Sequence, residues 1–188
     1  MNNRSDSESR KGNLEGDRGR GKTKRNGGML SIIFVVLCVF TLAVLILRIW
    51  FFAPVKIEGD SMNDTLITGE KYFIHKTKNV QRGDIIVFNL KGNKEDVYIK
   101  RLVAIEGDTV SVENDTLYVN GDKKEESYLK EQKRALDDGE VLTADIKEVT
   151  LEDGMYYVLG DNRMNSADSR DFGAISKEDI IGKLLKKE

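Results

Sequence analysis

The feature that most constrains this chain is a run of 19 residues without a charge, Met29–Leu47. As an α-helix it would be roughly 28 Å long, close to the ~30 Å hydrocarbon core of a bilayer. Arg48 and the aromatic residues at 50–52 suit the membrane interface, where arginine reaches the headgroups and aromatic rings gather. A cleaved secretory signal would have a shorter apolar region followed by small residues. The sequence therefore predicts an uncleaved transmembrane signal-anchor over residues 29–52.

The charges on the two sides of this run differ in sign. Residues 1–28 hold eight Lys and Arg against four Asp and Glu, whereas residues 53–188 hold 21 against 28. The positive-inside rule keeps a short basic flank in the cytoplasm, so residues 53–188 are expected outside, in a single-pass protein of the cell membrane. The composition of residues 1–28 predicts a disordered tail. Because the larger part is acidic, nucleic acid is not expected as a partner.

The chain has a single cysteine, Cys38, and a single histidine, His75. One cysteine excludes an intramolecular disulfide, and the two residues together are too few for a conventional zinc centre. Cys38 also falls inside the apolar run, which argues against a Cys–His nucleophile pair. Any hydrolytic chemistry has to be built from Ser, Lys, Asp and Glu.

Short runs of β-forming residues recur after residue 70, separated by Gly-Asp and Asn-Asp pairs that are typical of turns. These runs are Lys71–His75, Asp84–Leu90, Val97–Ile105, Thr109–Val112, Thr116–Val119 and Met155–Leu159. Asn114-Asp115 suits a tight hairpin turn, and Asn120-Gly121 marks the next turn. The outer domain is therefore predicted to be mainly β.

Two segments of the outer domain do not follow this pattern. Residues 122–148 are highly charged and contain a helix-like stretch, Tyr128–Leu136, so we interpret them as a surface excursion. Lys177–Leu185 is predicted to be a short terminal helix, with Ser176 as its N-cap.

Lys100 stands inside the predicted strand Val97–Ile105, both faces of which are largely apolar. If the strand is buried, the lysine loses hydration, which disfavours its charged form and lowers its pKa. A neutral amine near physiological pH can act as a general base. The alternative is an edge-strand lysine that reaches water or pairs with a carboxylate, and the strand alone favours that alternative.

Ser61 lies in the segment Gly59-Asp60-Ser61-Met62, shortly after the apolar run. On its own, a serine among turn residues is most simply a turn former. A serine needs a base to become a nucleophile, and with one imidazole in the chain a buried lysine is the natural candidate.

Three segments resemble, in order, the motifs of the type I signal peptidases, and of their Gram-positive-like branch in particular. They are GDSMNDTL at 59–66, YIKRLVAIEGDTV at 98–110 and LGDNRMNSADSRDFG at 159–173. The resemblance runs from about Val55 to Gly182. It implies a signal-peptidase-like β domain on one transmembrane helix, and a serine endopeptidase that removes signal peptides from exported preproteins. It also implies the lipid bilayer and a nearby secretion translocon as surroundings, and no cofactor or metal.

The resemblance assigns a role to each matching position. Ser61 is implied to be the nucleophile, Lys100 its general base, and Ser166 the residue that orients the lysine amine. Met62 is implied to line the substrate cleft. Four polar residues match those that shape the family's site through ion pairs: Arg101, Asp161, Asp168 and Arg170.

Two positions bear on how closely the chain follows the family. Gly59 provides no side-chain donor for an oxyanion hole, as in the glycine-bearing branch, so the backbone N–H of Ser61 is the implied donor. Asn63-Asp64 stands where the family commonly has a residue followed by proline, and losing the proline loosens the turn after Ser61.

Three other functions are compatible with parts of the sequence. A Ser-His-Asp hydrolase would use His75 as its base, but no nucleophile-elbow pattern accompanies that residue. Self-cleavage by a Ser–Lys dyad, as in SOS repressors, accompanies a DNA-binding region, whereas this chain has an apolar span. A non-catalytic membrane protein whose outer β domain binds a partner would agree with the departure at Asn63-Asp64.

Overall fold

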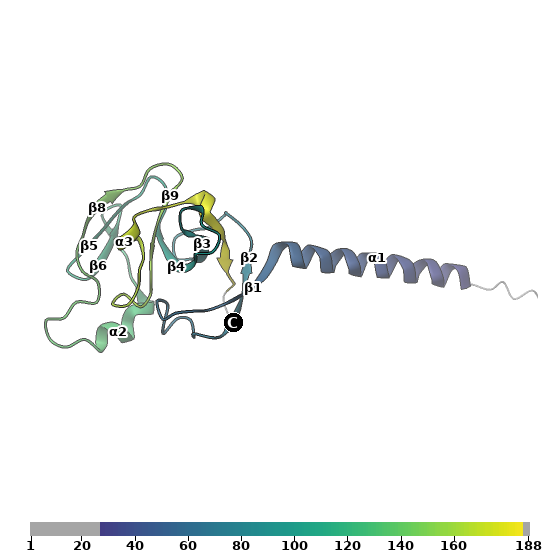
Figure 1. The fold of residues 1–188 in the computed structure, drawn as a ribbon, viewed down its shortest axis with the longest axis horizontal. Coiled ribbons are helices and arrows are strands. Elements are labelled where there is room, and N and C mark those ends of the chain that lie inside the picture. The colour runs from purple at the N-terminus through teal and green to yellow at the C-terminus, as the bar shows by residue number, and fades with distance from the viewer. Residues whose placement is uncertain (1–26, 186–188) are drawn as a thin grey trace, which may run out of the picture. The chain divides into compact units, whose positions relative to one another are not determined.

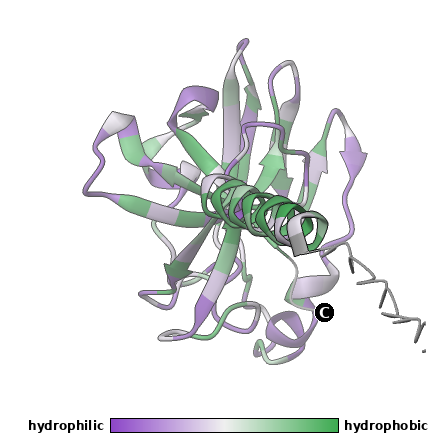
Figure 2. Ribbon diagram, turned by 90° about the vertical axis from the view of Figure 1, so that its right-hand side faces the viewer, coloured by the Kyte–Doolittle hydropathy of each residue, from purple (hydrophilic) through white to green (hydrophobic). Residues whose placement is uncertain are grey.

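The computed structural model describes residues 27–185, so the tail predicted for residues 1–28 lies almost entirely outside the described residues. The chain divides into two units, one that ends at Leu42 and one that begins at Ala43. Helix α1 (Gly27–Phe51) has 25 residues and is long and apolar enough to cross a membrane. Its described side chains are exposed, and Figure 2 shows the helix mostly in the green of hydrophobic residues. An apolar exposed surface of this kind suits contact with lipid.

The second unit is built mainly of antiparallel β-strands (Figure 1). The strands are β1 (Phe52–Lys56), β2 (Lys71–His75), β3 (Ile85–Asn89), β4 (Val97–Ala104), β5 (Thr109–Glu113), β6 (Thr116–Val119), β7 (Asp122–Lys123), β8 (Ile146–Thr150), β9 (Met155–Leu159), β10 (Ile175–Ser176) and β11 (Ile180–Leu184). The short helices are α2 (Lys130–Arg134) and α3 (Ser169–Phe172), and single 3₁₀ turns occur at Leu90–Gly92, Ser127–Leu129 and Lys177–Asp179.

These strands form two sheets. The larger has the order β1-β2-β11-β3-β4-β9-β10, and the smaller has the order β7-β6-β5-β8. All six strands predicted from the sequence are present, with ends within one residue of those expected. The predicted mainly β fold with one N-terminal apolar helix is confirmed.

The pairs Asn114-Asp115 and Asn120-Gly121, which predicted turns in the sequence, do form turns between strands. Between β5 and β6, Asn114 and Asp115 have φ angles of 49° and 56°, a left-handed conformation that Asn and Asp tolerate better than most residues. Asn120 and Gly121 repeat this between β6 and β7, with φ angles of 57° and 76°.

The prediction of a terminal helix over Lys177–Leu185 is wrong. Ser176 does cap a helical turn, since its Oγ accepts a hydrogen bond from the N–H of Glu178, but that turn ends at Asp179. The chain then becomes β11, which lies between β2 and β3. At Gly182 a Cβ would stand 2.3 Å from the carbonyl oxygen of His75, so close packing against β2 requires glycine there. Tertiary packing of the β-branched Ile180 and its neighbours outweighs the local helix signal.

Three clusters of buried apolar side chains support the second unit. The one closest to the candidate site consists of Ile57, Met62, Leu66 and Tyr72. Three of these residues belong to the segment between β1 and β2, and they turn its apolar side inward. The cluster therefore fixes the turn that carries Ser61.

Candidate active site

Ser61 stands on a tight turn after β1. The N–H of Asn63 donates to the carbonyl of Asp60 at 3.0 Å, and the N–H of Leu66 donates to the carbonyl of Met62 at 2.8 Å. Met62 is 2% exposed and its Sδ accepts the N–H of Asp161 at 3.4 Å. The turn is thus attached to the segment that follows β9, and the Ser61 side chain stays partly exposed.

Lys100 comes from the middle of β4 and meets Ser61. Its Nζ lies 2.6 Å from Ser61 Oγ, within hydrogen-bonding distance, and the residue is 4% exposed. No carboxylate of residues 27–185 forms an ion pair with it. Burial lowers the pKa of Lys100 to about 8, although the negative charges of Asp168 and Asp161 oppose this and Arg170 adds to it. The geometry is that of a buried amine beside a hydroxyl rather than of an edge lysine in water.

Ser166 lies beside this pair without a hydrogen bond to it. Its Oγ is buried and has no partner among the described residues. A Cβ placed on Gly160 would be 2.1 Å from Ser166 Oγ and 2.7 Å from the carbonyl oxygen of Ser61, so the two serines pack against the same glycine. The structure therefore brings Ser166 next to Ser61, with a hydroxyl available for a further partner.

Arg101 and Asp161 form a buried bidentate pair next to the Ser61 turn. Arg101 Nε donates to Asp161 Oδ1 at 2.8 Å and Nη2 donates to Oδ2 at 2.5 Å. Thr65 Oγ1 donates to the same Oδ2 at 2.5 Å. Since Arg101 follows Lys100 in β4 and Thr65 belongs to the turn of Ser61, Asp161 connects the two segments that carry the candidate dyad.

Asp168 and Arg170 form a second bidentate pair, with Arg170 Nε and Nη2 each 2.8 Å from the carboxylate oxygens. Asp168 is also the N-cap of α3 and accepts the N–H of Gly160 at 2.9 Å. Burial alone would raise the pKa of Asp168, but the hydrogen bonds from Arg170 and Gly160 bring it below its usual value. The carboxylate remains ionised and holds Gly160 in place.

Sequence reasoning missed a third ion pair close to the site, between Arg163 and Glu126. Arg163 Nε also donates to the carbonyl of Gly160 at 2.9 Å, and Nη1 donates to Thr143 Oγ1 at 3.0 Å. Glu126 and Thr143 belong to the charged excursion of residues 122–148, which looks solvated in the sequence. The position of Arg163 inside the third motif was the only signal that could have indicated a buried partner.

His75 is placed away from this arrangement. It ends β2, where its ring centroid lies 5.5 Å from that of Phe52 and 6.3 Å from that of Phe51. None of the hydrogen bonds within residues 27–185 joins His75 to Ser61. The geometry does not support a Ser-His-Asp triad.

A cleft of about 620 Å³ opens onto the two candidate residues. Ser61, Met62 and Lys100 line it, together with residues 54–59 and 97–99. In β4, pairing with β9 begins only at Arg101, so residues 97–100 have no strand on the cleft side among the described residues. The cleft therefore includes both Ser61 and a strand segment with an unpaired edge.

Residues 29–186 match the family model described as signal peptidase, peptidase S26. The chain belongs to this family. It is 37% identical over 167 residues to signal peptidase I P of Bacillus subtilis subsp. natto, a match that covers 86% of this chain and 90% of that protein. It is 42% identical over 160 residues to signal peptidase I U of Bacillus subtilis strain 168, with 82% of each chain covered.

A solved structure agrees with the sequence matches. The crystal structure of a signal peptidase I from Enterococcus faecalis V583 has a TM-score of 0.54 and 39% sequence identity, covering 57% of this chain and 97% of that chain. The resemblance of the three motifs to signal peptidases is confirmed. The contact between Ser61 and Lys100 joins the first and the second of these motifs in the folded chain.

Proposed function

We propose that this S26 family member is a membrane-anchored serine endopeptidase that removes signal peptides from exported preproteins, with Ser61 as nucleophile and Lys100 as general base. The observation that carries the proposal is the 2.6 Å contact between Ser61 Oγ and the buried Nζ of Lys100. The lowered pKa of that lysine, about 8, leaves a usable fraction of the amine neutral near physiological pH.

The reaction is acyl transfer in two halves. Neutral Lys100 accepts the hydroxyl proton of Ser61 while Oγ attacks the scissile carbonyl carbon. The tetrahedral intermediate collapses with cleavage of the C–N bond, and the lysine ammonium protonates the leaving amine. Water then gives a proton to the amine of Lys100 and attacks the ester carbonyl. The C–O bond to Ser61 breaks as the Lys100 ammonium returns that proton to Oγ, and the signal peptide leaves as a carboxylic acid that loses its proton to solvent.

The backbone supplies the oxyanion donor. The N–H of Ser61 has no hydrogen-bond partner within residues 27–185, while its carbonyl accepts the N–H of Asn162 at 3.0 Å. That arrangement leaves the N–H of Ser61 available for the negative oxygen of the intermediate. Gly59 offers no side-chain hydroxyl. Ser166, with its unpartnered Oγ, is the residue that would orient the lysine amine, and Met62 forms part of the cleft wall beside the nucleophile.

The four charged residues predicted to shape the site are given structural roles in this proposal. Arg101 and Asp161 hold the turn of Ser61 against β4, and Asp168 and Arg170 hold Gly160 under Ser166. None of these residues needs to exchange a proton with the substrate. No cofactor or metal is required.

A preprotein would bind extended in the cleft. Residues 97–100 of β4 present an unpaired edge, and a peptide strand can add main-chain hydrogen bonds there. The family's preference for small side chains at the first and third positions before the cut fits a peptide whose alternate residues face the cleft wall. The anchor α1 would make the chain a single-pass protein of the cell membrane and keep its catalytic unit at the outer surface of the bilayer. Preproteins leave the secretion translocon at that surface.

The proposal is tested with the full-length protein in detergent micelles and a purified preprotein. Correctly placed cleavage is expected from the wild type and should be lost in Ser61→Ala and in Lys100→Ala, because residues that act as a unit lose nearly all activity singly. If the chain is instead a non-catalytic protein that only binds a partner, the wild type will not cleave the preprotein. Full activity of either folded variant would remove the Ser–Lys assignment.

A further inference from the structure

The charged segment between β6 and β8 places an aromatic residue, Tyr128, against the candidate active site. The Cζ atom of Arg101 lies 3.9 Å from the centroid of the Tyr128 ring. The Tyr128 hydroxyl donates to Glu126 Oε1 at 2.8 Å and accepts from Arg163 Nη2 at 3.3 Å. Tyr128 thus touches two arginines from separate motifs, one directly after Lys100 in β4 and one in the third motif.

The charges around Tyr128 are paired and shielded from water. The side chains of Arg101 and Asp161 are 12% and 0% exposed, and those of Arg163 and Glu126 are 0% and 6% exposed. Burial, followed by the charge of Glu126, raises the pKa of the Tyr128 hydroxyl, so the hydroxyl stays protonated and can donate. A guanidinium on an aromatic face is held more strongly when water is excluded. The ring of Tyr128 covers one face of the Arg101 guanidinium, which is bound to Asp161.

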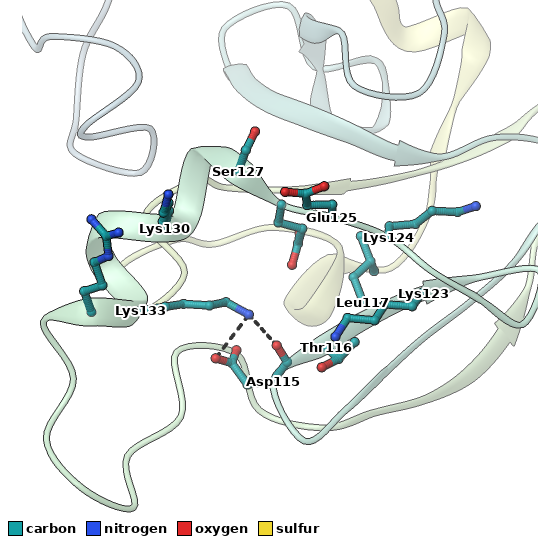
Figure 3. Close-up of a pocket in the computed structure, with 11 residues that line it drawn as sticks. Asp115, Thr116, Leu117, Lys123, Lys124, Glu125, Ser127, Lys130 and Lys133 are labelled. Carbon is teal, nitrogen blue, oxygen red and sulfur yellow. Dashed lines mark hydrogen bonds and ion pairs between the residues drawn. The ribbon is translucent and has the colours of Figure 1, made fainter.

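The segment that carries Tyr128 is itself fixed at both ends. Leu129 is fully buried, and Lys133 on α2 donates to the carbonyl of Asp115 and lies 3.2 Å from its carboxylate. Figure 3 shows Lys133 reaching across to Asp115 at the turn between β5 and β6. On the other side, Glu126 is paired with Arg163. The segment around Tyr128 is therefore fixed to the rest of the unit by buried and ion-paired side chains.

The Arg101–Asp161 pair transmits this fixed position to the reacting groups. Asp161 accepts the hydroxyl of Thr65, four residues after Ser61, and its N–H donates to the sulfur of Met62. A displacement of Arg101 would move Asp161 and, with it, the turn that carries the nucleophile. A misplacement of the order of 1 Å costs a catalytic step about a hundredfold.

We propose that Tyr128 is a positioning residue for the Ser61–Lys100 reaction: its ring holds the Arg101–Asp161 pair, which fixes the nucleophile turn relative to β4. Tyr128 is not part of the cleft wall and touches no reacting atom. The inference rests on the proposed function, since positioning has meaning only if Ser61 and Lys100 react. It gives the charged excursion a part in catalysis that its composition does not indicate.

The decisive comparison is between Tyr128→Leu, which removes the ring, and Tyr128→Phe, which keeps it. Full-length proteins in detergent micelles are assayed with a preprotein. We expect kcat of Tyr128→Leu to fall about tenfold to a hundredfold with little change in KM, because the cleft is untouched. Tyr128→Phe should keep most of the wild-type kcat. Tyr118→Leu, a half-buried tyrosine of β6, is the matched control and should behave as the wild type.

If Tyr128 only stabilised the fold, the folded Tyr128→Leu protein would keep the wild-type kcat. Should Tyr128→Leu fail to fold, Tyr128→Met has similar reach without the π-face, and its kcat decides in the same way. A wild-type kcat in the folded variant overturns the proposal, as does an equal loss in Tyr128→Phe. In an Arg101→Ala background, Tyr128→Leu should cost little further activity, because both changes disable the same contact; full additivity contradicts the proposal.

The two proposals fail in distinguishable ways. A wild type that does not cleave, or a folded Ser61→Ala protein that does, contradicts the proposed function and removes the positioning role with it. An active wild type with an equally active Tyr128→Leu variant removes only the role of Tyr128.

Discussion

Gly160 leaves no room for a side chain beneath Ser166, because a Cβ on Gly160 would lie 2.1 Å from Ser166 Oγ. The backbone of Gly160 cannot withdraw to make space. Its N–H is bound by Asp168 at 2.9 Å, and its carbonyl accepts from Arg163 at 2.9 Å. The same Cβ would stand 2.7 Å from the carbonyl oxygen of Ser61. One small residue therefore sets the distance between the nucleophile turn and Ser166.

Gly160→Ala is expected to displace both serines. Overpacking of this kind costs about 1–3 kcal/mol in the free energy of unfolding, and the displaced nucleophile lowers kcat by about a hundredfold. Thermal unfolding and preprotein cleavage measure the two effects. Gly182→Ala is the matched control, since its Cβ would meet the carbonyl of His75 at 2.3 Å in β11. It should lose stability while the folded fraction keeps its kcat, and an equal loss of kcat in both variants would contradict the prediction.

Ser166→Ala is expected to reduce activity without reducing stability. The Ser166 hydroxyl is buried without a partner among the described residues, so removing it leaves no bonded group unpaired and relieves a desolvated hydroxyl. The free energy of unfolding should stay the same or rise by up to about 1 kcal/mol. The loss of kcat should be smaller than in Lys100→Ala, because both reacting groups remain.

The matched control for Ser166 is Ser169→Ala. The Oγ of Ser169 accepts the buried N–H of Val158 at 2.9 Å, so its removal should cost about 1–3 kcal/mol. Comparable destabilisation in both variants would show that Ser166 has a structural partner. A wild-type kcat in Ser166→Ala would exclude an orienting role.

The sequence predicted the strands well because each strand and turn depends mainly on its own residues and those next to it. The pairs Asn114-Asp115 and Asn120-Gly121 adopt the left-handed conformations that their residue types tolerate. The terminal segment Lys177–Leu185 was mispredicted because its determinant lies elsewhere in the chain: Gly182 pairs with β3 and packs against the backbone of His75. Sequence periodicity carries no information about such a partner.

The residues of the candidate site likewise fall into those that the sequence indicated and those that only the folded structure revealed. The apolar residues on both faces of the strand predicted that the strand is buried, but on their own they favoured an edge lysine at position 100. The family resemblance supplied Lys100 as the base, together with Ser61 and Ser166. Tyr128 and Glu126 could not be found, because charged residues in a polar segment look solvated. Their burial depends on Arg163, a residue 35 positions after Tyr128. Only the folded chain brings these groups together.

Asp64 is the place where the chain departs from the family's proline, and its backbone has a φ angle of 73°. Proline is restricted to a φ near −65°, so it cannot occupy this conformation. Asp64→Pro should therefore destabilise the turn after Ser61 by about 1 kcal/mol or more and lower kcat. Asp64→Gly, which adopts a positive φ without strain, is the control and should retain activity. Higher stability and activity in Asp64→Pro would mean that the turn has the family's usual backbone in solution.

The pH dependence of cleavage should report Lys100. Only the neutral amine can accept the proton of Ser61, and burial lowers its pKa from 10.5 to about 8. The value of kcat/KM is therefore expected to rise tenfold per pH unit below pH 8 and to level off above it. A profile whose acid limb lies near 10.5 would show that Lys100 is not desolvated in the working enzyme.

The same lowered pKa makes Lys100 a cost to stability at neutral pH. Above 10.5 the lysine is neutral in both the folded and the unfolded chain, so folding carries no penalty. As the pH falls from 10.5 to about 8, the unfolded chain takes up a proton that the folded site resists, and the free energy of unfolding declines by about 3 kcal/mol. Lys100→Met has no group to titrate, so it should be inactive yet more stable than the wild type at pH 7, with a difference that shrinks toward pH 10.5. Denaturant unfolding across this range measures the difference. A Lys100→Met protein that is less stable than the wild type at pH 7 would indicate a charged, ion-paired lysine and would remove its role as the base.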